Sequence, residues 1–317
     1  MNKIRAAVVG LGSMGSNHFR VLSSIPEVEI VALCDLDINR VPRGRWSVTN
    51  NYREVAKIHP DLCVVATPTN SHLEITLHLI EMGIPILVEK PLAATADEVE
   101  QICIAKQRMS GSVAVGMIER FNEAVIAVKE MLLQGAIGKI QRIATNRVGP
   151  NRLAEEGALL DLGIHDLDLV HWLTGDLIRK SDAQFVVRNE IDIVASVSGR
   201  TVSGIIFEVV VSSISPKKRR RIEILGDAGE LEVELIGGRI SKNRFDEKTL
   251  EWGLSRELHG VTSSLETSLT AKVNEPLLLE HREVIAAIRK KDWSALPSVD
   301  EAFRLGQIID SLYGRIK

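Results

Sequence analysis

Three residues have the types and surroundings needed to take a proton from a hydroxyl group. Asp161 and His165 are four positions apart, a spacing that places both side chains on one side of a helix. A carboxylate beside an imidazole orients the ring and raises its basicity, which suits a general base, although alone such a pair fits a capped helix with a packed histidine equally well. Lys90 offers a charged amine that can hydrogen-bond the same hydroxyl and stabilise a developing alkoxide. The sequence leaves open whether His165 or Lys90 is the final proton acceptor.

The residues before Lys90 are expected to carry it to a ligand. Residues 84–88 form an apolar run that stops at Glu89-Lys90-Pro91. Short strands that are apolar throughout are typical of parallel sheets, and open α/β folds bind ligands at the carboxyl ends of such strands. We therefore expect Lys90 at the binding edge of a parallel sheet.

A glycine-rich turn near the N-terminus predicts a dinucleotide site. Gly10-Leu11-Gly12-Ser13-Met14-Gly15 lies between a β-rich run, residues 4–9, and a helical segment, residues 16–24, which is the setting that the G-x-G-x-x-G pattern requires. The first glycine allows the tight turn, the second lets the backbone approach a pyrophosphate, and the third lets the helix pack on the strand. The N–H groups at the helix start are expected to bind the phosphates.

The next strand supplies an acid for the ribose. Residues 29–34 form a second apolar strand, and Asp35 follows it, 20 positions after Gly15, where an acidic residue accepts the ribose hydroxyls. A carboxylate there would repel a 2′-phosphate, so NAD is expected and NADP is less favoured. The alternative is an aspartate that only shapes a turn.

Strand and helix patterns alternate through the first third of the chain. Strands are predicted at residues 62–66, 84–88 and 113–116, and helices at residues 73–82 and 95–108. Repeated βα units predict an α/β fold with a doubly wound parallel sheet, the Rossmann arrangement. We assign it to a first domain of residues 1–122.

The pattern changes after Asn122. A helix over residues 123–133 is followed by alternating β-rich runs with no helices between most of them, which predicts an α+β domain with an open, mostly antiparallel sheet. The second domain is expected to span residues 123–317, and its last two helices, residues 277–290 and 299–316, could pack back on the first domain. The basic run Lys217–Arg221 reads as a solvated strand start, and a contribution to binding a diphosphate stays open.

Composition excludes several classes of function. The 317 residues are 45% hydrophobic and 26% charged with a net charge of −3, as expected for a soluble globular protein that binds no nucleic acid. We expect a cytoplasmic protein without a membrane span or secretory signal. The cysteines Cys34, Cys63 and Cys103 are far apart, which predicts reduced core residues and no metal site.

These motifs, in this order, resemble the glucose-fructose oxidoreductase / inositol dehydrogenase (Gfo/Idh/MocA) family of nicotinamide-dependent sugar oxidoreductases. The likeness rests on the glycine turn, Asp35, Ala66-Thr67-Pro68, Glu89-Lys90-Pro91 and the run Asp161–Asp168. A narrower likeness to the UDP-N-acetylglucosamine 3-dehydrogenase branch lies in Gly116–Asn122, Arg147–Pro150 and Ser215–Arg219, with departures at Met117 and Glu123, where histidine and proline are commoner.

The resemblance implies roles for further residues. It implies an oxidoreductase in which Lys90, Asp161 and His165 are catalytic, no metal is needed, and the open sheet joins copies into a homo-oligomer. The residues implied in binding the cofactor are Gly10, Gly12, Ser13, Met14, Gly15, Asp35, Thr67, Pro68, Asn70, His72, Glu89, Lys90 and Asn122. The residues implied in binding the substrate are Arg120, Arg147, Asn151, Arg152, Asp161 and His165.

Three functions remain open at this point. The leading hypothesis is oxidation of a secondary hydroxyl of a sugar, sharpest as C3 of UDP-N-acetylglucosamine, with Arg147 and Arg152 binding the diphosphate. The second is a dehydrogenase of myo-inositol or another free polyol. The third is an NAD-sensing regulator without catalysis, which would have no use for a proton acceptor.

Overall fold

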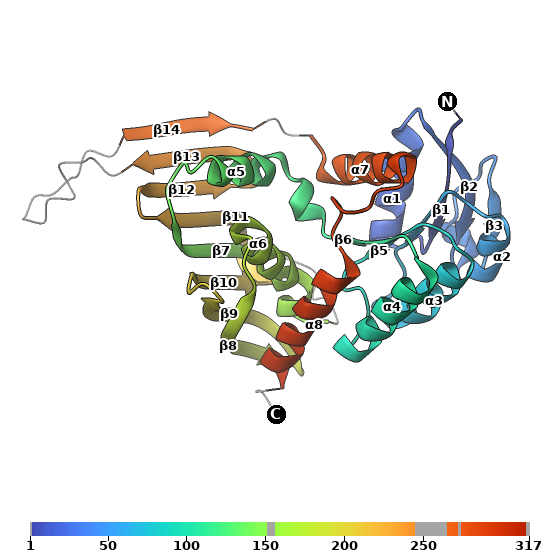
Figure 1. The fold of residues 1–317 in the computed structure, drawn as a ribbon. Helices are drawn as coiled ribbons and strands as arrows, with labels where there is room; N and C mark the ends of the chain where they lie inside the picture. The colour runs from blue at the N-terminus through green and yellow to red at the C-terminus, as the bar shows by residue number, and fades with distance from the viewer. Residues whose placement is uncertain (1, 151–155, 245–264, 272–273, 315–317) are drawn as a thin grey trace, which may run out of the picture. The chain divides into compact units, whose positions relative to one another are not determined.

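A computed structural model describes residues 2–150, 156–244, 265–271 and 274–314 (Figure 1). The chain divides into two compact units, one of residues 1–118 with 275–317 and the other of residues 119–274. The predicted domains were residues 1–122 and 123–317. The last two helices, however, are grouped with the first unit, because α7 (Pro276–Lys290) packs on α1 (Ser13–Ser24), and α8 (Val299–Tyr313) packs on α4 (Ala96–Met109).

The first unit contains a six-stranded parallel sheet in the order β3-β2-β1-β4-β5-β6. The order reverses between β1 and β4, and this is the point where open α/β sheets bind ligands. The strands are β1 (Ile4–Val9), β2 (Val28–Cys34), β3 (Ser47–Thr49), β4 (Leu62–Val65), β5 (Ile86–Glu89) and β6 (Val113–Gly116). The helices before α4 are α1, η1 (Ile38–Arg40), α2 (Tyr52–Lys57), η2 (Thr69–Ser71) and α3 (His72–Glu81).

Strands β4, β5 and β6 of this sheet are buried throughout, as their composition predicted. Every residue of β4, β5 and β6 is buried, including Glu89 at the end of β5. Burial on both faces follows from the helical crossovers that parallel strands need. The doubly wound sheet expected from the alternating motifs is confirmed.

The second unit is built on an eight-stranded sheet in the order β14-β13-β12-β11-β7-β10-β9-β8. All neighbours are antiparallel except β7 and β10, which pair in parallel because the chain crosses between them through α6 (Ile164–Thr174) and the hairpin of β8 and β9. The strands are β7 (Ile140–Pro150), β8 (Ile178–Arg188), β9 (Ile191–Thr201), β10 (Ile206–Ser212), β11 (Ile214–Gly226), β12 (Gly229–Glu234), β13 (Arg239–Arg244) and β14 (Leu265–Thr270). The mostly antiparallel sheet is confirmed.

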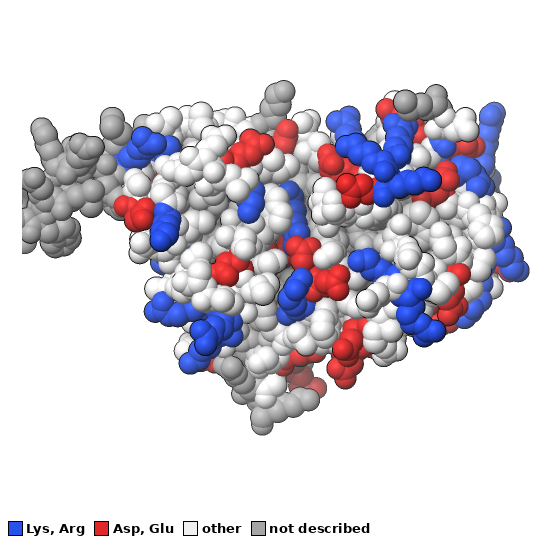
Figure 2. Space-filling view, viewed as in Figure 1, with Lys and Arg blue, Asp and Glu red and all other residues white. Residues whose placement is uncertain are grey.

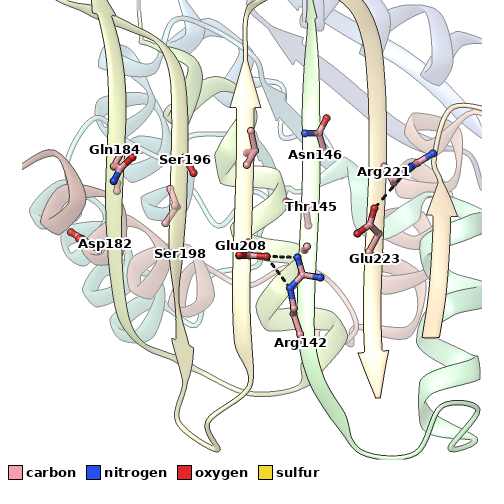
Figure 3. Close-up of a pocket in the computed structure, with 14 residues that line it drawn as sticks. Arg142, Thr145, Asn146, Asp182, Gln184, Ser196, Ser198, Glu208, Arg221 and Glu223 are labelled. Atoms are coloured by element: carbon pink, nitrogen blue, oxygen red, sulfur yellow. Dashed lines mark hydrogen bonds and ion pairs between the residues drawn. The ribbon is translucent and has the colours of Figure 1, made fainter. Parts of the chain in front are cut away.

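The two faces of this sheet differ. One face carries α5 (Glu123–Leu133) and α6, and alternate residues such as Ile143, Phe207 and Val209 are buried beneath them (Figure 1). The opposite face has a shallow hollow of about 450 Å³ lined mainly by polar residues (Figure 3). In the hollow, the Arg142 side chain pairs with Glu208. None of the predicted catalytic residues lines it.

Charge is mixed on the face drawn in Figure 2, where Lys and Arg side chains are interspersed with Asp and Glu side chains. Among the described residues, none of the helices combines the length and apolar character required to traverse a bilayer.

Candidate active site

The turn between β1 and α1 has the geometry of a dinucleotide-binding turn. Gly10 has a φ of +89°, and a Cβ atom there would lie 2.6 Å from the carbonyl oxygen of Ala66. A Cβ atom on Gly15 would lie 1.8 Å from the carbonyl oxygen of Gly10. A Cβ atom on Gly12 would meet nothing within 4 Å. The fold therefore needs glycine at the two outer positions, and the middle one leaves room for a ligand to approach the backbone.

The start of α1 offers hydrogen-bond donors to an anion. Gly12 is the N-cap, and no described side chain caps the helix. Ser13 and Met14 are its first two residues, and their backbone N–H groups lie before the first intrahelical donor, Ser16. Unused N–H groups and the helix dipole together favour binding of a phosphate at this end.

Asp35 directly follows β2 and is held at the same turn. Its Oδ2 accepts a hydrogen bond from the N–H of Leu11 at 2.6 Å, and its Oδ1 accepts one from the N–H of Asp37 at 2.9 Å. These bonds orient the carboxylate at the carboxyl edge of the sheet. Its remaining lone pairs can accept hydrogen bonds from ribose hydroxyls.

The segment after β4 forms part of the same edge. Pro68 is the N-cap of η2, and the hydroxyl of Ser71 donates to Oγ1 of Thr67 at 2.8 Å. Asn70 is exposed there. His72 is 1% exposed, with Nδ1 2.9 Å from the carbonyl oxygen of Pro91 and Nε2 2.8 Å from that of Thr67. His72 therefore links the ends of β4 and β5, and any effect on cofactor binding is expected to act through Thr67.

Glu89 and Lys90 end β5. Glu89 is buried, its Oε1 lies 2.7 Å from Nε2 of His18, and its Oε2 accepts the backbone N–H of Lys90 at 3.2 Å. A Cβ atom on Gly116, opposite on β6, would lie 3.3 Å from this carboxylate, so the glycine leaves space for it. Lys90 itself is half-buried at the carboxyl edge.

In the second unit, Asp161 lies in a π-helical turn that leads into α6. The turn η4 (Leu159–Gly163) ends where the N–H of Ile164 bonds to the carbonyl of Leu159, five residues earlier. Asp192 on β9 fixes its start by accepting the N–H of Leu159 at 2.8 Å. π-turns inside helices occur frequently at functional sites. His165 is the second residue of α6 and is buried, while Asp161 is half-buried.

A buried arginine holds the first turn of α6. Arg147, on β7, is 4% exposed and donates to Asp166 from Nε and Nη2 at 3.0 Å and from Nη1 to Glu119. Burial alone would lower the pKa of Arg147, but the two carboxylates raise it above its ordinary value. Arg147 was predicted to bind substrate phosphate. In the structure its donors face these two acids instead.

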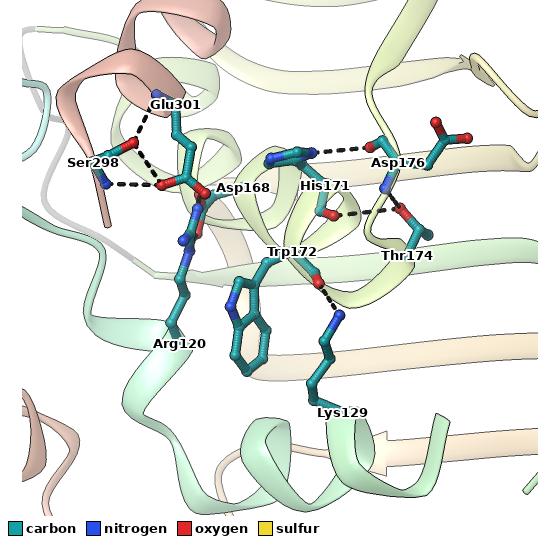
Figure 4. Close-up of polar contacts among 9 residues, drawn as sticks. All are labelled: Arg120, Lys129, Asp168, His171, Trp172, Thr174, Asp176, Ser298 and Glu301. Atoms are coloured by element: carbon teal, nitrogen blue, oxygen red, sulfur yellow. Dashed lines mark hydrogen bonds and ion pairs between the residues drawn. The ribbon is translucent and has the colours of Figure 1, made fainter. Parts of the chain in front are cut away.

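A second buried pair holds the next turn of α6. Arg120 donates from Nε to Oδ2 of Asp168 at 2.8 Å and from Nη2 to Oδ1 at 2.5 Å, and both residues are buried (Figure 4). Lys129 on α5 donates to the carbonyl of Trp172 at the other end of the same helix. The structure thus anchors α6 at three positions that follow His165.

Three further residues of the predicted set are Asn122, Asn151 and Arg152. Asn122 caps α5, because its Oδ1 accepts the N–H of Ala124 at 3.0 Å. Asn151 and Arg152 lie outside the described residues.

The basic run lies on β11. Arg220 is the member that turns toward the helix-covered face, where it is buried and donates to the carbonyl of Val148 at 3.1 Å. Arg221 points to the opposite face and lies 3.8 Å from Glu223. The other four members of the run are exposed, as expected for a solvated strand start.

The predicted residues form two groups. In the first unit the glycine turn, Asp35, Thr67, Asn70 and Lys90 follow the ends of neighbouring strands β1, β2, β4 and β5 at one sheet edge. Asp161, His165, Arg120 and Arg147 belong to the second unit. Sequence reasoning missed Glu119 and Asp166 as partners of Arg147. Alternation along β7 could have signalled them, because Arg147 shares the side of the buried Ile143 and Thr145.

Comparison with known proteins agrees with this geometry. Residues 4–117 match the family described as "Oxidoreductase family, NAD-binding Rossmann fold", and residues 125–232 match the "GFO/IDH/MocA C-terminal domain". A curated relative, inositol 2-dehydrogenase 2 of Saccharopolyspora erythraea, is 29% identical over 192 residues, which are 56% of this chain and 55% of that protein. The chain thus spans about half the length of the curated relatives it matches.

Solved structures share the whole fold. UDP-N-acetylglucosamine 3-dehydrogenase GnnA from Acidithiobacillus ferrooxidans superposes with a TM-score of 0.85 at 19% identity, covering 98% of this chain and 97% of that one. An oxidoreductase from Agrobacterium radiobacter in complex with NAD+, L-tartaric acid and magnesium has a TM-score of 0.85 at 17% identity, covering 99% and 96%. With both of its domains matched in sequence, the chain belongs to the GFO/IDH/MocA family of oxidoreductases and carries the NAD-binding Rossmann domain of that family.

Proposed function

We propose that this chain is an NAD-dependent dehydrogenase that oxidises a secondary hydroxyl group of a sugar, with C3 of UDP-N-acetylglucosamine as the sharpest form of the proposal. The observation that carries it is the position of Lys90, which follows β5 at the same sheet edge as the glycine turn and Asp35. A dinucleotide bound at that turn would extend along the sheet edge at which the amine of Lys90 lies. A sensor that only bound NAD would not need one.

The residues of the turn fit the cofactor. Gly12 faces open space, the start of α1 presents unused N–H groups, and the carboxylate of Asp35 is oriented for ribose hydroxyls. NAD supplies the acceptor for the hydride that leaves the carbon of the substrate.

The proton has to go to the protein. In the proposal, His165 accepts it, Lys90 donates a hydrogen bond to the same oxygen as negative charge develops, and Asp161 orients the base. A half-buried amine stabilises developing negative charge more strongly than water does, because the local dielectric is lower. Replacing His165 and Lys90 one at a time distinguishes which of the two is the final proton acceptor.

We expect Asp35 to set the preference for NAD over NADP. Replacing it with alanine removes the negative charge that a 2′-phosphate would meet, and the ratio of the two dissociation constants should fall by about tenfold, a change of about 1.4 kcal/mol. Fluorescence titration of NADH and NADPH measures both constants. Asp37→Ala is the matched control, because Asp37 is exposed and accepts a bond from the N–H of Asn39 in η1. Tighter binding of NADPH than of NADH by the unaltered protein would contradict the assignment.

The relatives and the narrower sequence likeness bear on the substrate class. The family includes inositol dehydrogenases, and the fold is shared with a UDP-N-acetylglucosamine 3-dehydrogenase. The narrower sequence likeness around Gly116–Asn122 and Ser215–Arg219 favours the nucleotide sugar. A diphosphate needs cationic donors, and Arg152 remains the candidate from the predicted set.

Side-by-side assays with UDP-N-acetylglucosamine and myo-inositol separate the three functions. We expect NADH absorbance to rise with the nucleotide sugar and not with the polyol. Arg152→Ala should raise the KM for the nucleotide sugar by about tenfold or more, since a charge-assisted hydrogen bond is worth about 1.5–3 kcal/mol. Turnover of myo-inositol alone would assign the polyol dehydrogenase. NAD binding without turnover across a wider panel of UDP-sugars and polyols would favour the regulator.

We also propose a homo-oligomer that uses the open face of the eight-stranded sheet. This face carries polar residues and the Arg142–Glu208 pair around the shallow hollow (Figure 3). The support is the family resemblance and the absence of covering helices among the described residues on that face. The role stays a prediction.

A further inference from the structure

A line of buried polar side chains crosses the first unit from α7 to the end of β5. His281, on α7, is fully buried, and its Nε2 lies 2.9 Å from Nδ1 of His18 on α1. His18 is also fully buried, and its Nε2 lies 2.7 Å from Oε1 of Glu89. None of these three side chains has a part in the proposed proton transfer. Their burial without such a part calls for another reason, because buried polar groups are costly unless they are hydrogen-bonded.

The hydrogen bonds in this line have a direction. A carboxylate can only accept, so Nε2 of His18 donates to Glu89, and when His18 carries a single ring proton its Nδ1 accepts from Nε2–H of His281. Burial and the neighbouring His18 lower the pKa of His281 well below its usual value, which keeps it neutral. That tautomer has no hydrogen on Nδ1 of His281, and this buried atom has no partner among the described residues.

A neighbouring acid lies beside the line. Glu280 precedes His281 on α7 and is 1% exposed. Burial and the nearby Glu89 raise its pKa well above the ordinary value, which favours its neutral form. Glu89 is the carboxyl group toward which the two imidazoles are directed.

Glu89 connects the two histidines to the backbone of Lys90 through its carboxylate. One carboxylate oxygen is taken by His18, and the other accepts the N–H of Lys90 at 3.2 Å. The carboxylate sits in the space left by Gly116, where a Cβ atom would crowd it at 3.3 Å. On the other side of Lys90, the buried His72 contacts the carbonyl of Pro91. The backbone that carries Lys90 is thus restrained on both sides by buried histidines.

We propose that His281 and His18 are positioning residues for Lys90, that they act through Glu89, and that α7 thereby completes the ligand-binding edge of the parallel sheet. The catalytic part of this inference rests on the proposed function of Lys90. The structural part concerns only the order of the Glu89–Lys90 backbone.

The first test separates loss of the hydrogen bond from loss of packing. His281→Leu keeps most of the volume and removes the donor, whereas His281→Gln offers a side-chain N–H near the position of Nε2. With the substrate that the assays above identify, His281→Leu should lower kcat about 10- to 100-fold, because small displacements of a catalytic group are costly. The dissociation constant for NADH should change less than twofold, and His281→Gln should recover most of kcat. An unchanged kcat in His281→Leu, or a loss in His281→Gln as large as in His281→Leu, would overturn the proposal.

A matched control measures the effect of destabilisation alone. Ile309→Ala removes a buried side chain from α8, the other helix that joins the first unit from the C-terminal segment. It should lower thermal stability and leave kcat of the folded protein unchanged. A kcat loss in Ile309→Ala equal to that in His281→Leu would reduce the role of His281 to folding and overturn the proposal.

Two measurements need no substrate. Hydrogen exchange at the amide of Lys90 should be at least tenfold faster in His281→Leu than in the unaltered protein and Ile309→Ala, and equal exchange in all three would refute the structural part. Nitrogen chemical shifts of the unaltered protein should show His281 as the neutral Nε2–H tautomer. A proton on Nδ1 of His281 would contradict the direction of the line. If Lys90→Ala keeps its turnover while these two results hold, the function of Lys90 fails and the restraint on its backbone stands.

Discussion

Turnover of Lys90→Ala is expected to fall by about 10²–10⁴-fold, the range over which a positioned acid–base group contributes to catalysis. NADH binding should change little, because the proposal assigns the pyrophosphate and ribose contacts to the glycine turn and Asp35. Stopped-flow turnover and a fluorescence titration of NADH on the same preparation measure the two effects. Lys57→Ala is the control, since Lys57 is a lysine of the same unit that is exposed and paired with Glu54.

His165→Ala is expected to lose turnover over the same range, and the pH dependence distinguishes the two residues. The variant that lacks the final proton acceptor should recover as the concentration of hydroxide rises, whereas the variant that lacks only a hydrogen-bond donor should keep the shape of the original pH profile. Near-normal turnover in either variant would remove that residue from the mechanism.

Replacing Asp166 with alanine is expected to lower the free energy of unfolding by about 3–5 kcal/mol. The change leaves the guanidinium of Arg147 buried with one of its two acids gone, and breaking a buried ion pair by removing one partner costs this much. Urea denaturation followed by circular dichroism measures it.

The same strand supplies the control for this measurement. Arg142 is five residues before Arg147 on β7, and it pairs with Glu208 on the open face, where both side chains are partly exposed. Glu208→Ala should cost about 0–1 kcal/mol, as partly exposed pairs usually do. Equal losses in the two variants would mean that burial does not determine the strength of the Arg147–Asp166 contact.

The sequence was sufficient for the fold of the first unit because the signals are local. The glycine turn and Asp35 each depend on a few neighbouring residues, and an apolar run bounded by turn residues is enough to predict a buried strand. The second sheet was predicted less completely. Strands β13 and β14 are short and polar, so their alternation is weak, and the parallel pairing of β7 with β10 depends on a crossover that periodicity does not reveal.

The environment of the site was harder to predict than its residues. The spacing of Asp161 and His165 indicated a helix. It did not indicate the π-turn at Leu159–Gly163, whose first N–H, that of Leu159, donates a hydrogen bond to Asp192 on a distant strand. Arg120 was predicted as a ligand-binding residue because of the family resemblance, and Arg147 because arginine suits phosphate. Their acidic partners Asp168 and Asp166 lie 48 and 19 positions away, and pairing over such distances is decided by tertiary packing. His18 and His281, 263 positions apart, carried no signal that would connect them.

The route of the chain through the first unit has a consequence for biosynthesis. Residues 1–118 leave the ribosome first, but the helices that cover α1 and α4 belong to residues 275–317, and all of the second unit is made in between. Contacts that close so long a loop form late, because closing the loop costs conformational entropy before the contact can stabilise the fold. The nascent first unit therefore leaves these sides of α1 and α4 uncovered while the second unit, which is continuous in sequence, is completed. Until residues 275–317 have been made, His18 on α1 lacks its partner His281.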